Sequence, residues 1–361
     1  MADPDADLDT ALADPDADLD TAVRAACTDA GFEVTRIEPL RSGLSLRRFA
    51  RVHTRSARDP SLVARVEAPE DPAGRPAAAA PEPPLEPIRA LLESHGLPVP
   101  RRLGGDAQRG VELLEDLGGQ DLASAAREAD PETRRALYRE ACSLLPRLQR
   151  IGPEPGVAAF ERQLDAALLD YKAGLFADDA LPARGRPTRE AERDCVREAF
   201  ARIAEGLARA PQRLAHRDYQ SANLLVRSAG AKPSLGWIDF QGAFLAPPEY
   251  DLVCLLRDSY VELPPEEVEA LAEAVRPELP DAPGREDFWR RFDWLTLTRK
   301  GKDYARFVHA AHRRGEGRFL AHLPTTARHL HRAARTAAAR DPWLAPLAEL
   351  VLALPETPCA P

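Results

Sequence analysis

The chain has 361 residues, of which 44% are hydrophobic and 30% are charged. A chain of this length usually holds more than one domain or lobe, and no apolar run approaches the roughly 18 residues of a membrane helix. The five cysteines are scattered, which argues against a disulfide framework and against a CxxC metal site. The first residues form neither a basic region nor an apolar segment, so we expect no secretory signal and a cytoplasmic protein.

The formal net charge of −9 is concentrated in residues 1–20. This segment contains eight aspartates and no lysine or arginine, and the rest of the chain carries 50 acidic against 49 basic residues. The near balance argues against a nucleic-acid partner. The segment includes a tandem repeat, ADPDADLDTAL at 2–12 and ADPDADLDTAV at 13–23. Its polar composition predicts a disordered acidic tail over residues 1–20 that makes no contact with a functional site.

Hydrophobic periodicity predicts a β-rich part followed by a helical part. A helix at 21–31 precedes expected strands at 32–40, 45–53, 61–67, 99–105 and 110–115, with a second helix at 85–95. Helical patterns then cover 131–150, 158–175, 187–209, 264–275, 286–314 and 325–353. Only 213–245 interrupts them, with strand-like triplets between polar turns. We therefore predict an α+β fold with a small β-rich lobe at 21–117 and a larger helical lobe at 118–361.

The most specific pattern lies inside that interruption. The tripeptide His216-Arg217-Asp218 is followed five residues after its aspartate by Asn223, and Asp239 follows a short apolar run. Phosphoryl transfer from ATP needs a group that orients the attacking hydroxyl and accepts its proton, and oxygen ligands for Mg²⁺. Asp218 fits the first requirement, and Asn223 with Asp239 fit the second. A lone His-Arg-Asp would be weak evidence in this chain, but the joint pattern is specific.

This segment, with IDFQGAFLAPPEYDLVCLLRDSYVELP at 238–264, resembles the aminoglycoside phosphotransferase and choline kinase family. The resemblance covers residues 22–354, and 298–307 with 318–324 look like its branch of N-acetylmuramate/N-acetylglucosamine anomeric kinases. It implies a bilobal protein-kinase-like fold, ATP and Mg²⁺ as cofactors, and a role in cell-wall recycling. It also implies Asp218 as the catalytic base and Asn223 and Asp239 as the metal ligands.

The resemblance assigns supporting roles as well. His216 and Arg217 would brace the catalytic loop, His216 by hydrogen bonding, and Asp251 would hold the loop backbone. Residues of the small lobe would bind the nucleotide, namely Ser42, Gly43, Leu44 and Ser45 in a phosphate-covering hairpin, Arg65 where the family usually has a strand lysine, and Glu115 and Leu117 near the adenine. Arg65 could instead lie on an exposed strand face. Glu86 and Glu93 are alternative partners for it.

The acceptor is specified less closely than the reaction. The leading prediction is an amino sugar of the N-acetylmuramate or N-acetylglucosamine type, phosphorylated at its anomeric hydroxyl. Gln241, Glu161 and Tyr171 are the candidate contacts. Two departures from the branch bear on this prediction: Gly242 stands where those kinases tend to carry aspartate, and the helix after residue 158 lacks their tryptophan-rich segment.

Two alternative functions stay open at this point. An aminoglycoside or choline-like alcohol would bring a cation, which needs carboxylates such as Glu161, Asp165 or Glu249. A nucleotide-binding pseudokinase or regulator is supported by Arg65 alone and opposed by the intact Asp218. In every case we expect a small-molecule partner and no membrane or nucleic acid. The sequence leaves the oligomeric state open.

Overall fold

The computed structural model describes residues 15–40, 47–67, 83–227 and 234–358, with side chains from residue 19 onward. The chain divides into two compact units. The first contains the described residues up to 67 together with Pro100–Leu117, and the second contains residues 83–99 and the chain from Gly118 onward. Residues 83–99, which we expected in the small lobe, thus pack with the helical unit. Hydrogen bonds explain this, because Trp237 N–H donates to the Pro98 carbonyl at 2.7 Å and Arg147 to the Gly96 carbonyl at 2.9 Å.

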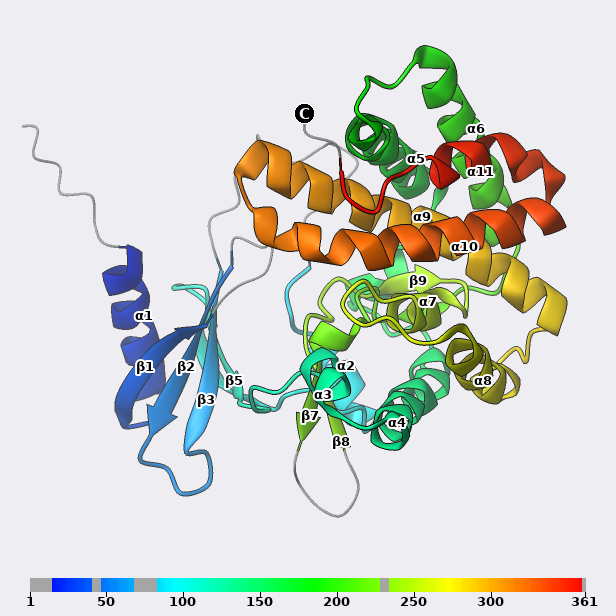
Figure 1. Ribbon diagram of the computed structural model, residues 1–361. Coiled ribbons are helices and arrows are strands. Elements are labelled where there is room, and N and C mark those ends of the chain that lie inside the picture. The colour runs from blue at the N-terminus through cyan, green and yellow to red at the C-terminus, as the bar shows by residue number, and fades with distance from the viewer. Residues whose placement is uncertain (1–14, 41–46, 68–82, 228–233, 359–361) are drawn as a thin grey trace, which may run out of the picture. The chain divides into compact units, whose positions relative to one another are not determined.

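The first unit is a five-stranded antiparallel sheet with one helix (Figure 1). Its strands are β1 (Val34–Leu40), β2 (Arg48–Thr54), β3 (Ser61–Val66), β4 (Arg102–Asp106) and β5 (Val111–Glu115). They are ordered β1-β2-β3-β5-β4, and helix α1 (Pro15–Asp29) packs on the sheet. The strands predicted from alternation are all present, with ends displaced by a few residues, as expected for boundaries that depend on caps and turns.

Helix α1 begins within the segment that we predicted to be a disordered tail. Residues 15–20 are helical, so that prediction is wrong for them, and residues 1–14 lie outside the described residues. The reason is the spacing of Leu19, Val23 and Ala26, which places all three on one helix face. Their side chains are buried in the cluster that includes Val52 and Leu113 of the sheet. The second copy of the repeat therefore contributes to the hydrophobic core.

We expect Leu19→Ala to lower the free energy of unfolding by about 2 kcal/mol or more, the lower end for a buried Leu→Ala change. The side chain of Leu19 is only 3% exposed against the sheet. Arg24→Ala is the matched control, because it removes only an exposed ion pair with Asp20, which is worth ~1 kcal/mol at most. Urea unfolding of the two variants tests this. Equal stability of both variants would show that the start of α1 does not contribute to the core.

The second unit is mainly helical. Its helices are α2 (Ile88–Ser94), α3 (Leu122–Glu128), α4 (Pro131–Gln149), α5 (Ala166–Leu175), α6 (Glu190–Ala208), α7 (Tyr250–Leu256), α8 (Pro265–Val275), α9 (Arg285–Arg314), α10 (Leu323–Arg340) and α11 (Ala345–Leu352). Two antiparallel strand pairs accompany them, β6 (Arg213–Ala215) with β9 (Phe244–Ala246) and β7 (Leu224–Arg227) with β8 (Ser234–Trp237). The predicted α+β class is confirmed.

Two long helical predictions are broken in the structure. The segment 158–175 contains only a short 3₁₀ turn before α5, whose start is capped by Asp165, which accepts from the Leu168 N–H at 2.8 Å. The segment 325–353 is divided into α10 and α11 at Asp341-Pro342, because proline is favoured at a helix start and not inside one. Helices α9 and α10 lie side by side (Figure 1). None of the helices in the described ranges has the length and apolarity to span a membrane.

Candidate active site

The strand pair β7–β8 brings Asn223 and Asp239 together. Leu224 is paired with Trp237, so the residue before β7 and the residues after β8 meet at the same end of the pair. The Ile238 N–H donates to the Asn223 carbonyl at 3.0 Å, and the backbone of Asp239 has a φ of 63°, a left-handed turn that aspartate tolerates. The Asn223 amide nitrogen consequently lies 3.5 Å from a carboxylate oxygen of Asp239.

Asp218 lies on the same loop. Its backbone carbonyl accepts a hydrogen bond from the Asn223 side-chain amide at 2.8 Å and another from the Gln220 N–H at 2.8 Å. The structure therefore places the predicted base directly beside the predicted metal ligands. Because the Asn223 nitrogen is used in holding the loop, its side-chain oxygen is the atom left to bind a cation.

Asp251, at the start of α7, binds the backbone at the N-terminal end of this loop, as predicted. Its carboxylate accepts from the backbone N–H groups of His216 at 2.7 Å and Arg217 at 3.1 Å. Arg217 has a φ of 79°, a strained conformation for a residue with a side chain, and these two bonds stabilise it. Burial raises the pKa of Asp251 to about 7, although the two hydrogen bonds act in the opposite direction.

A second buried aspartate, Asp258, holds the other half of the loop. It follows α7 and accepts hydrogen bonds from both the backbone N–H of Ser221, at 2.8 Å, and the Ser221 hydroxyl. Lys300 of α9 lies near enough for its charge to favour the ionised form of Asp258, although burial raises the pKa overall. The loop between His216 and Asn223 is thus fixed at both ends by carboxylates that are buried in the helical unit.

His216 supports the loop in a different way from our prediction. Its imidazole packs edge-on against Tyr219, Trp237 and Phe240, with ring centroids 5.4–6.2 Å apart. Among the described residues its ring nitrogens have no partner in full hydrogen-bond geometry, although backbone groups of His216 and Ile238 lie near enough to act on the ring, so packing is the main support. Burial lowers the pKa of His216 to about 4, and the ring is therefore neutral at pH 7.

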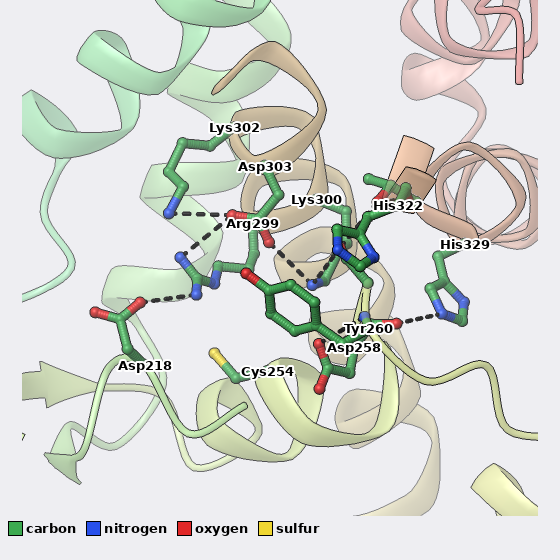
Figure 2. A network of polar contacts seen from close by, with 12 residues as sticks. Asp218, Cys254, Asp258, Tyr260, Arg299, Lys300, Lys302, Asp303, His322 and His329 are labelled. Carbon is green, nitrogen blue, oxygen red and sulfur yellow. Dashed lines mark hydrogen bonds and ion pairs between the residues drawn. The ribbon is translucent and has the colours of Figure 1, made fainter. Parts of the chain in front are cut away.

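Arg299 of α9 is the direct partner of Asp218. One guanidinium nitrogen lies 2.8 Å from an Asp218 carboxylate oxygen, and another lies 3.5 Å from Asp303 (Figure 2). Burial alone would raise the pKa of Asp218, but the positive charges of Arg299, Lys302 and Arg217 outweigh it and hold the pKa well below its usual range. Asp218 is therefore ionised at neutral pH, as a group that accepts a proton must be.

We expect Arg299→Met to raise the pKa of Asp218, because it removes the cation that stabilises the carboxylate. The acid limb of the kcat/KM profile should then move to higher pH. Arg290→Met is the control on the same helix, because the Arg290 guanidinium pairs with Glu286 and Asp287 and not with Asp218. An unchanged profile for Arg299→Met would show that Arg299 does not set the ionisation of the base.

The donor set around Asn223 and Asp239 suits Mg²⁺. One Asp239 oxygen accepts a hydrogen bond from the Gln241 amide at 2.7 Å, which orients the carboxylate. An amide oxygen and a carboxylate are hard ligands, and Mg²⁺ commonly takes only one or two side chains and completes its shell with phosphate and water. Gln241, which we predicted to contact the acceptor, thus contacts Asp239, and its contact with the acceptor stays a prediction.

Those predicted nucleotide-binding residues that the structure describes lie in the first unit. Ser42, Gly43, Leu44 and Ser45 fall outside the described residues. Arg65 on β3 is buried and pairs with Glu112 and Glu67, each at 2.5 Å, so it is not an exposed strand residue. Glu86 and Glu93, which we considered as partners for Arg65, both bind Arg89.

Glu115 and Leu117 end this unit. Glu115 accepts from the backbone and side chain of Arg101 at 3.2 Å, and Leu117 is buried. The boundary between the units falls directly after Leu117. The assignment of these residues and of Arg65 to a nucleotide stays a prediction.

The candidate acceptor contacts are dispersed. Glu161 is exposed on a 3₁₀ turn, and Tyr171 of α5 is half-buried. Of the carboxylates considered for a cationic acceptor, Asp165 caps α5 and Glu249 is fully buried against Arg291 at 2.7 Å. Glu249 is therefore not available to a cationic ligand as it stands, whereas Asp165 and Glu161 are exposed.

Our sequence reasoning missed Arg299, Asp258 and Lys172. Helical periodicity marked Arg299 only as part of a long helix, and its partner Asp218 is 81 positions away. One signal was present in the composition. Of the 49 basic residues only four are lysines, and Lys172, Lys300 and Lys302 all lie in or beside this network.

Solved structures with the same fold are kinases of small molecules. Choline kinase LicA from Streptococcus pneumoniae aligns with a TM-score of 0.59 and 14% identity over 89% of this chain and 99% of its own. The GDP complex of aminoglycoside 2'-phosphotransferase-IIIa aligns with a TM-score of 0.61 and 16% identity over 87% and 99%. The fold is therefore protein-kinase-like, with a small β-rich and a larger helical part, as predicted.

The sequence comparison defines the family. Residues 36–289 match the Phosphotransferase enzyme family, and the chain belongs to it. A relative from Pseudomonas aeruginosa, named N-acetylmuramate/N-acetylglucosamine kinase, is 32% identical over 76% of this chain and 78% of its own length. The chain is thus a phosphotransferase whose acceptor is a hydroxyl group.

Proposed function

We propose that this enzyme transfers the γ-phosphate of ATP, with Mg²⁺, to the anomeric hydroxyl of an amino sugar of the N-acetylmuramate or N-acetylglucosamine type. The likeness to the Pseudomonas aeruginosa relative, 32% identical over 76% of the chain, carries the choice of acceptor. The grouping of Asp218 and Asn223 on one loop, with Asp239 brought beside them by the β7–β8 pair, supports the reaction type. It also argues against a pseudokinase, because all three groups that the chemistry needs are present and positioned.

Each residue of the site has a separate role in the proposed reaction. Asp218 orients the sugar hydroxyl and accepts its proton as the bond to phosphorus forms. Its ionised state is maintained by Arg299, and its position by the Asn223 amide. Asn223 and Asp239 would hold Mg²⁺, which supplies positive charge to the phosphates when bound. Asp251 and Asp258 keep the loop rigid, so that little reorganisation is needed during the reaction.

The alternative acceptors are less well supported. An aminoglycoside or choline-like alcohol is cationic and needs carboxylates in its site, and of the three candidates Glu249 is buried against Arg291, while Asp165 and Glu161 are exposed. The solved structures of choline and aminoglycoside kinases are only 14–16% identical to this chain and indicate its fold alone. We therefore propose the amino sugar as the acceptor.

The test is ADP release by the purified protein with ATP and Mg²⁺ across amino sugars, aminoglycosides and choline-like alcohols. We expect turnover with the two N-acetylated sugars, and loss of the reducing end in the product, because an anomeric phosphate blocks ring opening. N-Acetylglucosaminitol, which has no anomeric hydroxyl, should not be phosphorylated. Turnover restricted to aminoglycosides or choline, or a product that is still a reducing sugar, would contradict the proposal.

A further inference from the structure

Three cationic side chains lie around Asp218, and the reaction as described uses only Arg299. The others are Arg217 on the loop itself and Lys302 on α9, and the amine of Lys172 on α5 lies near all three. The charges of Arg299, Lys302 and Arg217 all act on the Lys172 amine and on the Asp218 carboxylate. The base of the proposed reaction therefore lies among cationic side chains, an arrangement that favours an anionic acceptor over a cationic one.

Packing of aromatic rings connects Lys172 with the catalytic loop. The Lys172 amine lies 5.6 Å from the centroid of the Tyr250 ring, and the Tyr250 ring packs edge-on against Phe244 at 5.1 Å. The Arg217 guanidinium lies 5.9 Å from the centroid of that same Phe244 ring. The Lys172 amine and the Arg217 guanidinium therefore lie against the same pair of packed rings, Tyr250 and Phe244.

Helix α9 supplies the remaining two cations. Figure 2 shows Arg299 and Lys302 on the same helix, with Asp303 between them and Asp218 bound to the far side of the Arg299 guanidinium. Helix α5 packs against α9, and the segment that follows α5 approaches it closely at Gly301. A Cβ atom at Gly301 would lie 3.0 Å from the Phe176 ring, so a larger residue would push these elements apart.

The nearby carboxylates are already engaged. Asp218 is bound by Arg299, and Asp303 is contacted by Arg299, Lys300 and Lys302 at 2.9–3.5 Å. Lys172 is different, because its side chain is buried and its amine has no hydrogen-bond partner among the described residues. A buried polar group without a partner is costly, and such groups call for a functional explanation. Burial and the adjacent cations also lower the pKa of Lys172 well below its usual value.

The use of lysine here stands out against the composition. The chain has only four lysines among 49 basic residues, so arginine is its default cation. A lysine amine is compact, and its protonation responds to its surroundings, whereas a guanidinium stays charged and needs room for a planar fork. A group that is buried without a partner, and that binds an anion when one arrives, is suited to lysine.

We propose that Lys172 and Lys302, with Arg217, form an anion-binding subsite beside Asp218 that receives a carboxylate of the acceptor. N-Acetylmuramate carries such a carboxylate on its lactyl ether, and N-acetylglucosamine does not. The inference rests on the proposed function and adds to it a preference for the acidic sugar. Because the carboxylate takes no part in the bond changes at the anomeric oxygen, the subsite acts on acceptor binding and thus on KM.

Lys172→Met tests this, because it keeps an unbranched apolar chain and removes only the amine. We expect the ratio of kcat/KM for N-acetylmuramate to kcat/KM for N-acetylglucosamine to fall about 10-fold or more, the lower range for a charge-assisted hydrogen bond. The loss should appear in the KM for N-acetylmuramate. Lys302→Met should lower the same ratio. Arg202→Met is the control, because Arg202 lies over the Trp343 ring on another helix.

The methyl ester of N-acetylmuramate removes the charge from the ligand side. Wild-type enzyme should discriminate against the ester about as strongly as Lys172→Met discriminates against the acid. Lys172→Met with the ester should show little further loss, which is the non-additivity expected of two groups in contact. If Lys172→Met does not fold, Lys302→Met and the ester comparison on the wild-type enzyme decide the question.

The outcomes are distinct. An equal fall in kcat for both sugars in Lys172→Met, with the ratio of their kcat/KM values unchanged, would overturn the acceptor subsite. An unchanged ratio in both lysine variants, or no discrimination against the ester, would also overturn it. If wild-type enzyme phosphorylates neither sugar, the proposed function itself fails. Turnover of both sugars without any effect of the carboxylate leaves that function in place and removes only the subsite.

Discussion

Asp218→Asn should lower kcat by at least ~10², the low end for general acid–base catalysis. The amide cannot accept the hydroxyl proton, but its oxygen can still accept the hydrogen bond from Arg299 that Asp218 now accepts at 2.8 Å. The backbone carbonyl of residue 218, which binds the Asn223 amide, is also unaffected. The loop should therefore stay in place and the loss should be chemical.

The measurement is kcat and the KM for ATP, with unfolding in urea as the check on stability. Asp194→Asn is the control, because the Asp194 side chain is an exposed carboxylate on α6. We expect the KM for ATP of Asp218→Asn to stay within about threefold of wild type, since uniform binding of the nucleotide does not involve this carboxylate. Near-normal turnover with intact stability would remove Asp218 as the base.

Asp239→Ala should abolish Mg²⁺-dependent turnover of ATP. Asp239 provides the only carboxylate in the predicted ligand pair, and Gln241 and Asn223 both contact it. The described ranges contain no cluster of three or more His, Cys, Asp or Glu side chains that could hold the ion elsewhere. Excess Mg²⁺ should therefore fail to restore activity.

Asn223→Ala provides the comparison for Asp239→Ala. It removes a neutral ligand and also the hydrogen bond to the Asp218 carbonyl, so we expect reduced turnover and a higher Mg²⁺ requirement, with partial recovery at high Mg²⁺. Titration of turnover against Mg²⁺ for the two variants distinguishes the roles. Recovery of Asp239→Ala at high Mg²⁺ would show that the metal is held by other groups.

The proposed carboxylate subsite also predicts different pH profiles for Lys172→Met and Lys302→Met. Because the cations also lower the pKa of Asp218, Lys302→Met should disturb both acceptor binding and the ionisation of the base, whereas Lys172 is not among the charges that act most strongly on Asp218. A comparison of the pH profiles of the two lysine variants therefore separates recognition of the sugar from tuning of the base.

The sequence by itself determined the chemical groups of the site and the class of fold. Asp218, Asn223 and Asp239 lie within 22 consecutive residues, and the apolar triplets between them predicted the strands whose pairing joins them. Alternation and helical periodicity also located the sheet and most of the helices. These are local properties, because the period of an element is written in its own residues.

Only the tertiary structure decided how these groups are supported. Arg299 is 81 positions from the base that it binds, Asp258 is 37 positions from Ser221, and the Lys172 amine of α5 lies over the ring of Tyr250 in α7. No local pattern pairs such residues, since the contacts exist only once α5, α7 and α9 are packed. Leu19 is a second example. The acidic residues around it predicted a disordered coil, but its side chain is buried against the sheet, and the segment is helical. Burial and long-range pairing, which are cooperative properties of the packed chain, settled what composition alone could not.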